Sequence, residues 1–314
     1  MLKSRVKLLL LALFLMAAAG GCSAGSAART APGFDGDAAL MLVKKQTDFG
    51  PRVPGSQAHR QTLEWMEGFL RQLTDVVQRQ PFTAYNPHSR ESVAAANLIA
   101  SFYPQKGRRI MLCAHWDSRP VADMESPPVD EPIDGAVDGA AGTAIMLQLA
   151  RILAEHEPAY GVDIVLFDAE DLGVAGAYPD FENWFQGSRY FATVAKQTGY
   201  KPWFAILVDL VGDKEATYYK EQISLDYAPD VVRRVWDVAA ALGVEQFQQG
   251  GYPGTLYDDH WILNRDAGIP SIDITELTGD YRYWHTREDT YDKVSAESLA
   301  AVGKVLVGVL YPTQ

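Results

Sequence analysis

The sequence is poor in cysteine and in positive charge. Only Cys22 and Cys113 occur among its 314 residues, and Cys113 lies within the apolar run Ile110–Ala114. We expect such a cysteine to be a small buried hydrophobic residue rather than a nucleophile. The 28 Lys and Arg residues are outnumbered by 40 Asp and Glu, which gives a formal net charge of −12. A surface of this charge repels phosphate backbones, so no nucleic-acid partner is expected.

The start of the chain carries one apolar segment, Leu8–Ala19, which follows three positively charged residues. The segment is short for a membrane span, and its charged start and small-residue end predict a signal peptide over residues 1–21. Because Gly20-Gly21 directly precedes Cys22, the site resembles the lipobox of bacterial lipoproteins, with lipid attached to the Cys22 sulfur. Ordinary secretion, with Cys22 as a bystander, is the alternative.

Cleavage at this site would change both the charge and the cysteine content. Residues 1–21 hold three positive and no negative charges, so their removal moves the net charge from −12 to −15. If Cys22 carries lipid, only Cys113 remains and an internal disulfide is impossible. Residues 22–36 are rich in Ala, Gly and Ser and predict a flexible tether. We expect a bacterial cell-envelope protein, lipid-anchored or secreted, whose membrane contact is limited to its N-terminal lipid.

Residues 37–314 show no repeat and no internal linker, so one large domain is expected. Apolar runs predict strands at Val76–Phe82, Ala95–Ser101, Arg108–His115, Val162–Phe167 and Ala205–Val208. Helical spacing predicts helices at Gln57–Leu73, Gly139–Glu157, Gly187–Gln197, Asp230–Leu242, Asp259–Asp266 and Ala296–Leu310. This alternation indicates a single α/β domain with a mixed, mostly parallel central sheet flanked by helices on both faces.

Several hydrophobic runs end in a carboxylate or a histidine. These are Arg109–His115, Val162–Asp171, Phe204–Asp209 and the stretch from Ile269 to Trp284-His285. Parallel strands deliver such residues to one edge of a sheet, where open α/β sheets bind ligands. Asp138 precedes the predicted helix Gly139–Glu157, whose amino end stabilises negative charge. The pattern therefore predicts a metal site at this edge.

The residue types at this edge suit zinc. Carboxylate oxygen and imidazole nitrogen are zinc ligands, and no thiolate cluster competes for the metal. Adjacent carboxylates in Asp168–Asp171 would repel one another unless a cation or a shared proton relieved them. Asp117, two residues after His115, is placed to orient the imidazole ring of a metal-facing histidine. A solvated acidic turn and a locally hydrogen-bonded histidine are the alternatives.

The ordered set of motifs resembles the zinc-dependent M28 metallopeptidases, which have a zinc aminopeptidase-like, phosphorylase/hydrolase-like fold, and within them the glutaminyl cyclases. The resemblance covers most of residues 36–314. Its motifs are Pro54-Gly55-Ser56, Ala114-His115-Trp116-Asp117-Ser118, Val137-Asp138-Gly139-Ala140, Phe167–Asp171, Gly187-Ser188-Arg189, Asp209-Leu210-Val211-Gly212, Asp258-Asp259-His260 and Trp284-His285-Thr286.

The resemblance implies a role for each matching residue. Asp138, Asp171 and His285 would be the zinc ligands, and Glu170 the general acid and base. Asp209 and Asp258 would form the acidic hydrogen-bond network around Glu170, with Asp259 as the alternative to Asp258. Trp284 would line the substrate pocket. One departure is that Asp171 stands where animal cyclases commonly have glutamate, which bears on local geometry more than on the metal.

The resemblance implies an enzyme that cyclises the N-terminal glutamine of peptides to pyroglutamate with release of ammonia, using one zinc ion. An M28 aminopeptidase, which would use two zinc ions, is the first alternative. Its second metal would bind through residues matching His115 and Asp209, but single-zinc cyclases retain both. Trp284, Gly187-Ser188-Arg189 and Pro54-Gly55-Ser56 resemble cyclases more closely. A non-catalytic peptide-binding lipoprotein is the second alternative.

Three further histidines lie outside the motifs named above. His59, His88 and His156 fall in predicted helices or loops, so we expect surface roles for them. Trp184, in the loop before Gly187, would either edge the pocket or pack beneath it.

Overall fold

The computed structural model describes residues 31–174, 181–251, 254–276 and 282–312. The predicted signal peptide, Cys22 and most of the predicted tether lie outside these residues. Phe34, near the end of that tether, is buried and packs over Gly303. Helix α1 (Gly36–Thr47) follows it, with the Asp35 carboxylate accepting a hydrogen bond from the Ala38 backbone N–H.

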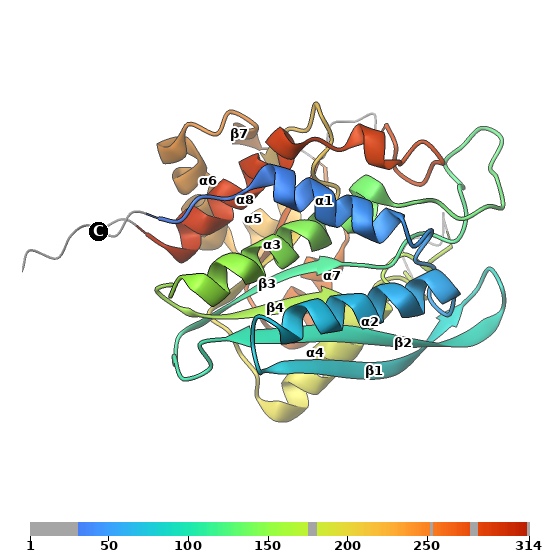
Figure 1. Cartoon of the computed structure of the whole chain (residues 1–314), viewed down its shortest axis with the longest axis horizontal. Helices are drawn as coiled ribbons and strands as arrows, with labels where there is room; N and C mark the ends of the chain where they lie inside the picture. The colour runs from blue at the N-terminus through green and yellow to red at the C-terminus, as the bar shows by residue number, and fades with distance from the viewer. Residues whose placement is uncertain (1–30, 175–180, 252–253, 277–281, 313–314) are drawn as a thin grey trace, which may run out of the picture.

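Six strands form the central sheet of the described chain, in the order β1-β2-β4-β3-β5-β8, and Figure 1 shows β1, β2, β4 and β3 side by side. Their bounds are β1 Val77–Asn86, β2 Glu91–Phe102, β3 Arg109–His115, β4 Gly161–Phe167, β5 Phe204–Val208 and β8 Ser271–Ile274. β1, β2 and β4 pair antiparallel, whereas β4, β3, β5 and β8 run parallel. The predicted mixed, mostly parallel sheet is confirmed.

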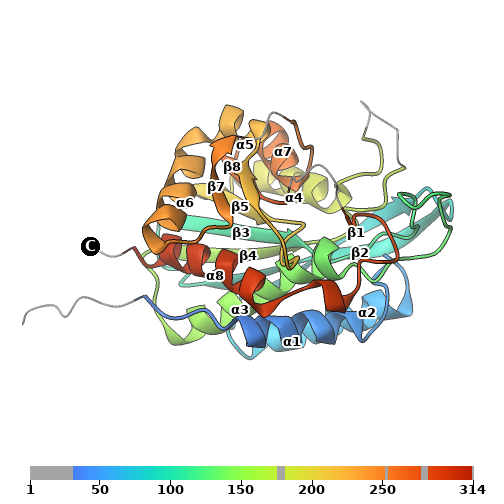
Figure 2. The same cartoon turned by 90° about the horizontal axis from the view of Figure 1, so that it is seen from above.

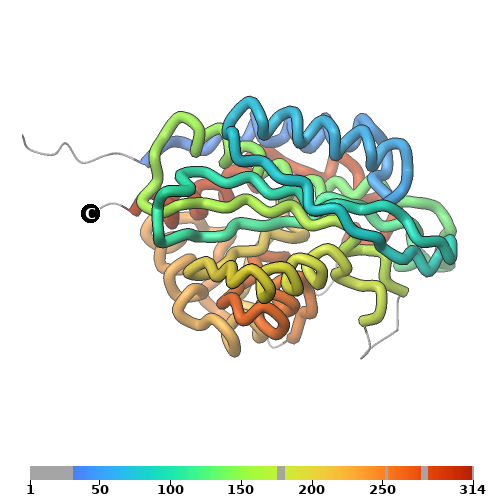
Figure 3. Tube along the Cα trace, turned by 90° about the horizontal axis from the view of Figure 1, so that it is seen from below, coloured from blue at the N-terminus to red at the C-terminus, as the bar shows by residue number. Residues whose placement is uncertain are grey.

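Helices cover both faces of this sheet (Figure 2). One face carries α1, α2 (Gln57–Arg71), α3 (Gly142–Glu155) and α8 (Ala296–Leu310), and the other carries α4 (Gln186–Thr198) and α7 (Asp259–Ile262). Figure 3 shows α1 and α2 on the side of the sheet opposite α4. Helices α5 (Gln222–Tyr227) and α6 (Pro229–Leu242) pack beside β8, and a small second sheet pairs β6 (Tyr218–Lys220) with β7 (Phe247–Gly251).

The strands in the middle of the sheet are mostly apolar, and β4 carries one buried aspartate, Asp163, which pairs with Arg109 of β3. All seven residues of β4 and all five of β5 are buried, as expected for parallel strands covered on both faces. Cys113 lies in β3, fully buried, which confirms its expected place in the core. The segment Ala136–Glu155 is long and apolar enough to cross a membrane, but 94% of its 18-residue apolar window is buried, so here it forms part of the core.

The structure differs from the predicted elements where the chain bends. Helix α3 begins at Gly142 rather than Gly139, after a π-helical turn at Ala136–Ala141. Gly139 has a φ of 95°, and a Cβ there would lie 2.5 Å from the Asp117 carbonyl oxygen, so the bend requires glycine. The predicted helix Asp259–Asp266 is divided into α7 and a second π-helical turn, Leu263–Ala267. A 3-10 turn, Tyr291–Lys293, precedes α8.

Candidate active site and metal centre

The candidate site lies at the carboxyl edge of the parallel strands. His115 is the last residue of β3, Asp168–Asp171 follow β4, and Asp209 follows β5. Asp138 comes from the turn before α3, and His285 from the loop after β8. The convergence predicted from the ends of the hydrophobic runs is thus present, because neighbouring parallel strands end at the same edge.

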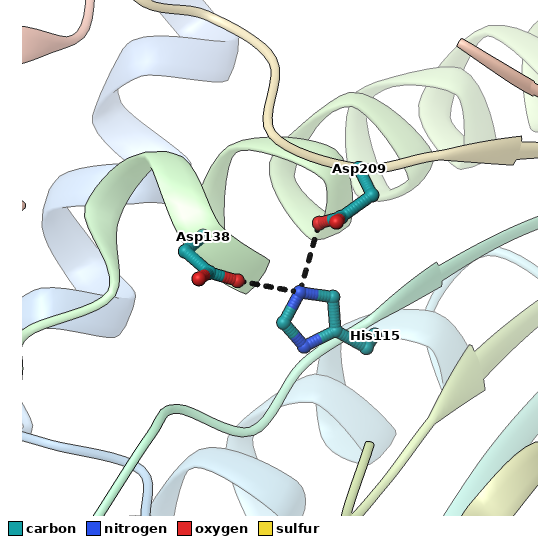
Figure 4. Close-up of side chains that lie close together, drawn as sticks. All are labelled: His115, Asp138 and Asp209. Carbon is teal, nitrogen blue, oxygen red and sulfur yellow. Dashed lines mark hydrogen bonds and ion pairs between the residues drawn. The ribbon is translucent and has the colours of Figure 1, made fainter. Parts of the chain in front are cut away.

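His115, Asp138 and Asp209 form a first group of potential ligands (Figure 4). Nε2 of His115 lies 2.9 Å from Oδ1 of Asp209 and 3.0 Å from Oδ1 of Asp138. These are hydrogen-bonding distances, so this imidazole nitrogen already contacts both carboxylates directly.

Asp138, Asp171 and His285 form a second group, with ligand atoms within 4.8 Å of one another. Nε2 of His285 lies 3.1 Å from Oδ1 of Asp171 and 3.8 Å from Oδ2 of Asp138. Among the described residues, the buried Oδ2 atoms of Asp138 and Asp171 have no hydrogen-bond partner. Buried oxygens of this kind are costly unless something satisfies them, so the three predicted ligands fit a divalent cation such as zinc.

Asp117 supports the site in a different way from the one predicted. Its Oδ1 lies 3.6 Å from Nδ1 of His115, too far for a hydrogen bond. Instead its two oxygens accept the backbone N–H groups of Glu170 at 3.1 Å and Asp171 at 3.2 Å. Asp117 therefore holds the loop that carries the proposed base and one proposed ligand.

The backbone beside the site has left-handed residues that are not glycine. Ala169, next to Glu170, has a φ of 54°, Leu210, next to Asp209, has 46°, and His285 itself has 57°. Each such residue stores about 1–3 kcal/mol of strain, which the surrounding packing must offset. Glycine is required nearby at position 187, where a Cβ would lie 2.3 Å from the Asp168 carbonyl oxygen.

The proposed base, Glu170, lies in a buried acidic environment. Its Oε2 is 4.0 Å from Nδ1 of His115, and burial together with the Asp171 charge holds its pKa well above the usual range. Burial and Asp209 likewise raise the pKa of Asp258. Asp258 lines the pocket while Asp259 does not, which favours Asp258 as the member of the acidic network.

A pocket of about 590 Å³ opens onto the second ligand group. It contains the carboxylates of Asp138, Glu170, Asp171, Asp209 and Asp258, and no lysine or arginine among its described lining residues. Its apolar wall is formed by Met124, Val174, Phe181, Trp184, Phe185, Leu210, Leu256, Tyr257 and Trp284. Trp284 stacks on His285 with ring centroids 3.9 Å apart, and Trp184 lines the pocket rather than packing beneath it.

The expected surface role of His59 is wrong. The side chain is 2% exposed, and its Nε2 contacts the two carboxylate oxygens of Asp168 at 2.9 and 3.0 Å. It also stacks on Trp116 at a centroid distance of 4.3 Å. Helical spacing carried a signal for this, because Leu63 and Met66 lie four and seven residues further along α2 and are also buried.

An α/β sheet with a carboxylate–histidine cluster at its carboxyl edge defines the zinc-peptidase-like class of enzyme folds. The Peptidase family M28 matches residues 97–310, and the chain belongs to this family.

Solved structures resemble the chain over nearly its whole length. The Bacteroides thetaiotaomicron glutaminyl cyclase bound to N-acetylhistamine is 35% identical, with a TM-score of 0.86, covering 91% of this chain and 100% of that one. A Zn-dependent exopeptidase from Parabacteroides distasonis is 34% identical, with a TM-score of 0.84, covering 90% and 100%. The bovine glutaminyl-peptide cyclotransferase is 24% identical over 292 residues, covering 82% of this chain and 76% of the relative.

Proposed function

We propose that this protein is a zinc-dependent glutaminyl-peptide cyclotransferase acting on peptides and proteins with an N-terminal glutamine. One observation carries the proposal. Glu170, the ligand group Asp138, Asp171 and His285, and the stacked Trp284 all face one pocket. The similarity to bacterial glutaminyl cyclases supports the same conclusion.

The reaction joins two atoms of one substrate residue. The α-amine nitrogen bonds to the side-chain carbonyl carbon, the bond from that carbon to the amide nitrogen breaks, and ammonia leaves. Asp138, Asp171 and His285 would hold the zinc ion, which supplies Lewis-acid stabilisation of the developing oxyanion. Glu170 accepts a proton from the α-amine and returns one to the departing nitrogen.

The remaining pocket residues set the pKa of the carboxyl groups and orient the substrate. Asp209 and Asp258 keep the pKa of nearby carboxyl groups high, which suits a group that must both accept and donate a proton. Trp284 and Trp184 provide apolar walls for the substrate side chain. Because nucleophile and electrophile belong to one residue, holding that residue in a bent conformation accounts for much of the rate.

The alternative is an M28 aminopeptidase with a second metal ion between His115, Asp138 and Asp209. Asp138 belongs to both groups, and His285 contacts Asp171 at 3.1 Å much as His115 contacts its two carboxylates at 2.9 and 3.0 Å. The cyclase is favoured instead by the pocket position of Trp284, stacked on His285, and by the similarity to bacterial glutaminyl cyclases. A non-catalytic peptide-binding role is disfavoured because the base and all three ligands are present.

Product mass separates these functions. The purified protein is incubated with a Gln-initiated peptide and a Glu-initiated control, with and without a chelator. Cyclisation lowers the mass of the Gln peptide by about 17 Da and releases ammonia, whereas hydrolysis releases a free amino acid. A bound zinc content near one per chain is expected. Release of amino acids without the loss of ammonia would overturn the proposal.

We also propose that the mature protein is anchored in the bacterial cell envelope through lipid on Cys22. The support is the residue pattern before Cys22. Fatty-acid labelling of the full-length chain and of a Cys22→Ala variant tests it, since only the former should carry label. Equal labelling of the two chains would contradict the anchor.

A further inference from the structure

Arg119 lies directly behind the proposed metal ligands. Its side chain is 0% exposed, and its Nη1 donates to both the carbonyl oxygen of Asp171 at 3.0 Å and Oδ1 of Asp171 at 3.1 Å. The guanidinium thus fixes this residue through its backbone and its side chain together.

The other edge of the guanidinium binds Asp123. Nε and Nη2 donate to the two carboxylate oxygens at 2.8 and 2.5 Å, a bidentate pair. Oδ1 of Asp123 lies 3.4 Å from Nδ1 of His285, the ring nitrogen that faces away from Asp171. One arginine–aspartate pair therefore contacts two of the three proposed ligands from outside the pocket.

The same guanidinium also reaches the pocket wall. Its Cζ lies 4.7 Å from the ring centre of Trp184, and Trp184 is nearly parallel to His285 at a centroid distance of 5.9 Å. Arg119 accordingly contacts Asp171, contacts His285 through Asp123, and packs against the residue that covers His285.

We propose that Arg119, together with Asp123, is a positioning residue that holds Asp171 and His285 in the geometry that binds the metal. This rests on the metal-binding part of the proposed function. The charges of Arg119 and Asp123 support a geometric rather than an electrostatic role. A lone guanidinium would repel a cation, but the Asp123 carboxylate neutralises the guanidinium charge, so the pair adds little net field at the metal.

Arg119→Lys tests the proposal because it keeps the positive charge and removes the bidentate fork. Arg109→Lys is the matched control. Arg109 forms the same kind of fork with Asp163, at 2.8 and 2.6 Å, at the opposite end of β3 from His115. Zinc dissociation constants are measured by competition with a chromophoric chelator, and thermal unfolding midpoints are measured on the zinc-free proteins.

Arg119→Lys is expected to weaken zinc binding by about 10-fold or more, the usual effect of losing an outer-shell partner. Arg109→Lys is expected to lower the unfolding midpoint similarly while leaving the zinc dissociation constant within about 2-fold of the parent. An unchanged zinc constant in Arg119→Lys would overturn the proposal. An equal loss of zinc affinity in both variants would show that Arg119 has only a general structural role, and it would also overturn the proposal.

Asp123→Asn provides a second test that does not require Arg119→Lys to fold. It preserves the shape of the side chain, removes the charge near Nδ1 of His285, and leaves the Arg119 charge uncompensated. Weaker zinc binding is expected, by about 10-fold, and unchanged binding would contradict the proposal. Zinc binding is measured without turnover, so these results are independent of the cyclase assay. The positioning role of Arg119 and the cyclase activity can therefore each fail without the other.

Discussion

The carboxylate of Asp289 holds the backbone of Asp138. Its Oδ2 accepts the N–H of Asp138 at 3.0 Å, and its Oδ1 accepts the N–H of Val137 at 2.7 Å. Asp117 makes the same pair of contacts with Glu170 and Asp171. Two proposed ligands are therefore positioned through their peptide groups by buried aspartates from distant parts of the chain.

Replacement of Asp289 by Asn is expected to weaken zinc binding by about 10-fold. The amide has one oxygen, so one of the two N–H groups loses its acceptor and the turn that carries Asp138 loosens. Asp292→Asn is the control, because that side chain is 71% exposed and lies in the next turn. Chelator competition measures both. Zinc affinity that is equal in the two variants would show that the contacts with Asp289 do not set the position of Asp138.

Replacement of Glu170 by Gln is expected to lower kcat by about 10²- to 10⁴-fold while zinc remains bound. The amide keeps the size of the side chain but cannot accept and return a proton. Turnover of a Gln-initiated peptide and zinc content are measured on the same preparation. Glu215→Gln, which changes a largely exposed carboxylate, should keep full activity. Normal turnover in Glu170→Gln would rule out this proton transfer.

Replacement of His59 by Phe is expected to lower the free energy of unfolding by about 3 kcal/mol. The ring would still stack on Trp116, but the buried Asp168 carboxylate would lose the partner that now contacts both of its oxygens. His156→Phe, at an exposed position after α3, is the control. Denaturant unfolding measures both changes, and a cost below 1 kcal/mol at position 59 would contradict the interpretation.

The central fold could be predicted because it depends on local patterns. β3, β4 and β5 are mostly apolar because both faces of each strand are buried, and α2 shows a clear apolar stripe. β8 has only four residues, too few to stand out within the stretch from Ile269 to His285 that contains it. The small sheet of β6 and β7 has no apolar run of its own, and its pairing depends on contacts between distant segments.

The ligand group could be predicted because strand ends and motif order both place Asp138, Asp171 and His285 together. The residues that hold these ligands in place could not be predicted from the sequence. Asp289 lies 151 positions from Asp138, and Arg119 lies 52 positions from Asp171. Such hydrogen bonds depend on tertiary packing, and an isolated Asp or Arg in a loop carries no periodic signal for them. The left-handed backbone at Ala169 and His285 is likewise imposed by that packing.

The zinc-free protein is expected to lose stability as the pH rises from about 4 to 7. Burial raises the pKa of Glu170, Asp258 and Asp138, and it raises that of Asp289 to about 7 from an ordinary 3.8. In this range the folded state keeps protons that the unfolded chain has released, so increasing pH favours unfolding. Carboxyl groups with lowered pKa, such as that of Asp171, change stability only at lower pH.

Zinc should remove much of this loss, because its positive charge stabilises the ionised carboxylates and its binding releases their protons. The difference in unfolding free energy between zinc-loaded and chelator-treated protein should therefore widen from pH 5 to pH 7. Asp289→Asn should flatten the pH dependence of the zinc-free protein, since one of the raised groups can no longer titrate. Denaturant titrations at both pH values measure these differences. A zinc-free protein that is equally stable or more stable at pH 7 would mean that the carboxylates titrate near their ordinary values, and that the acidic pocket needs no cation to offset its charge.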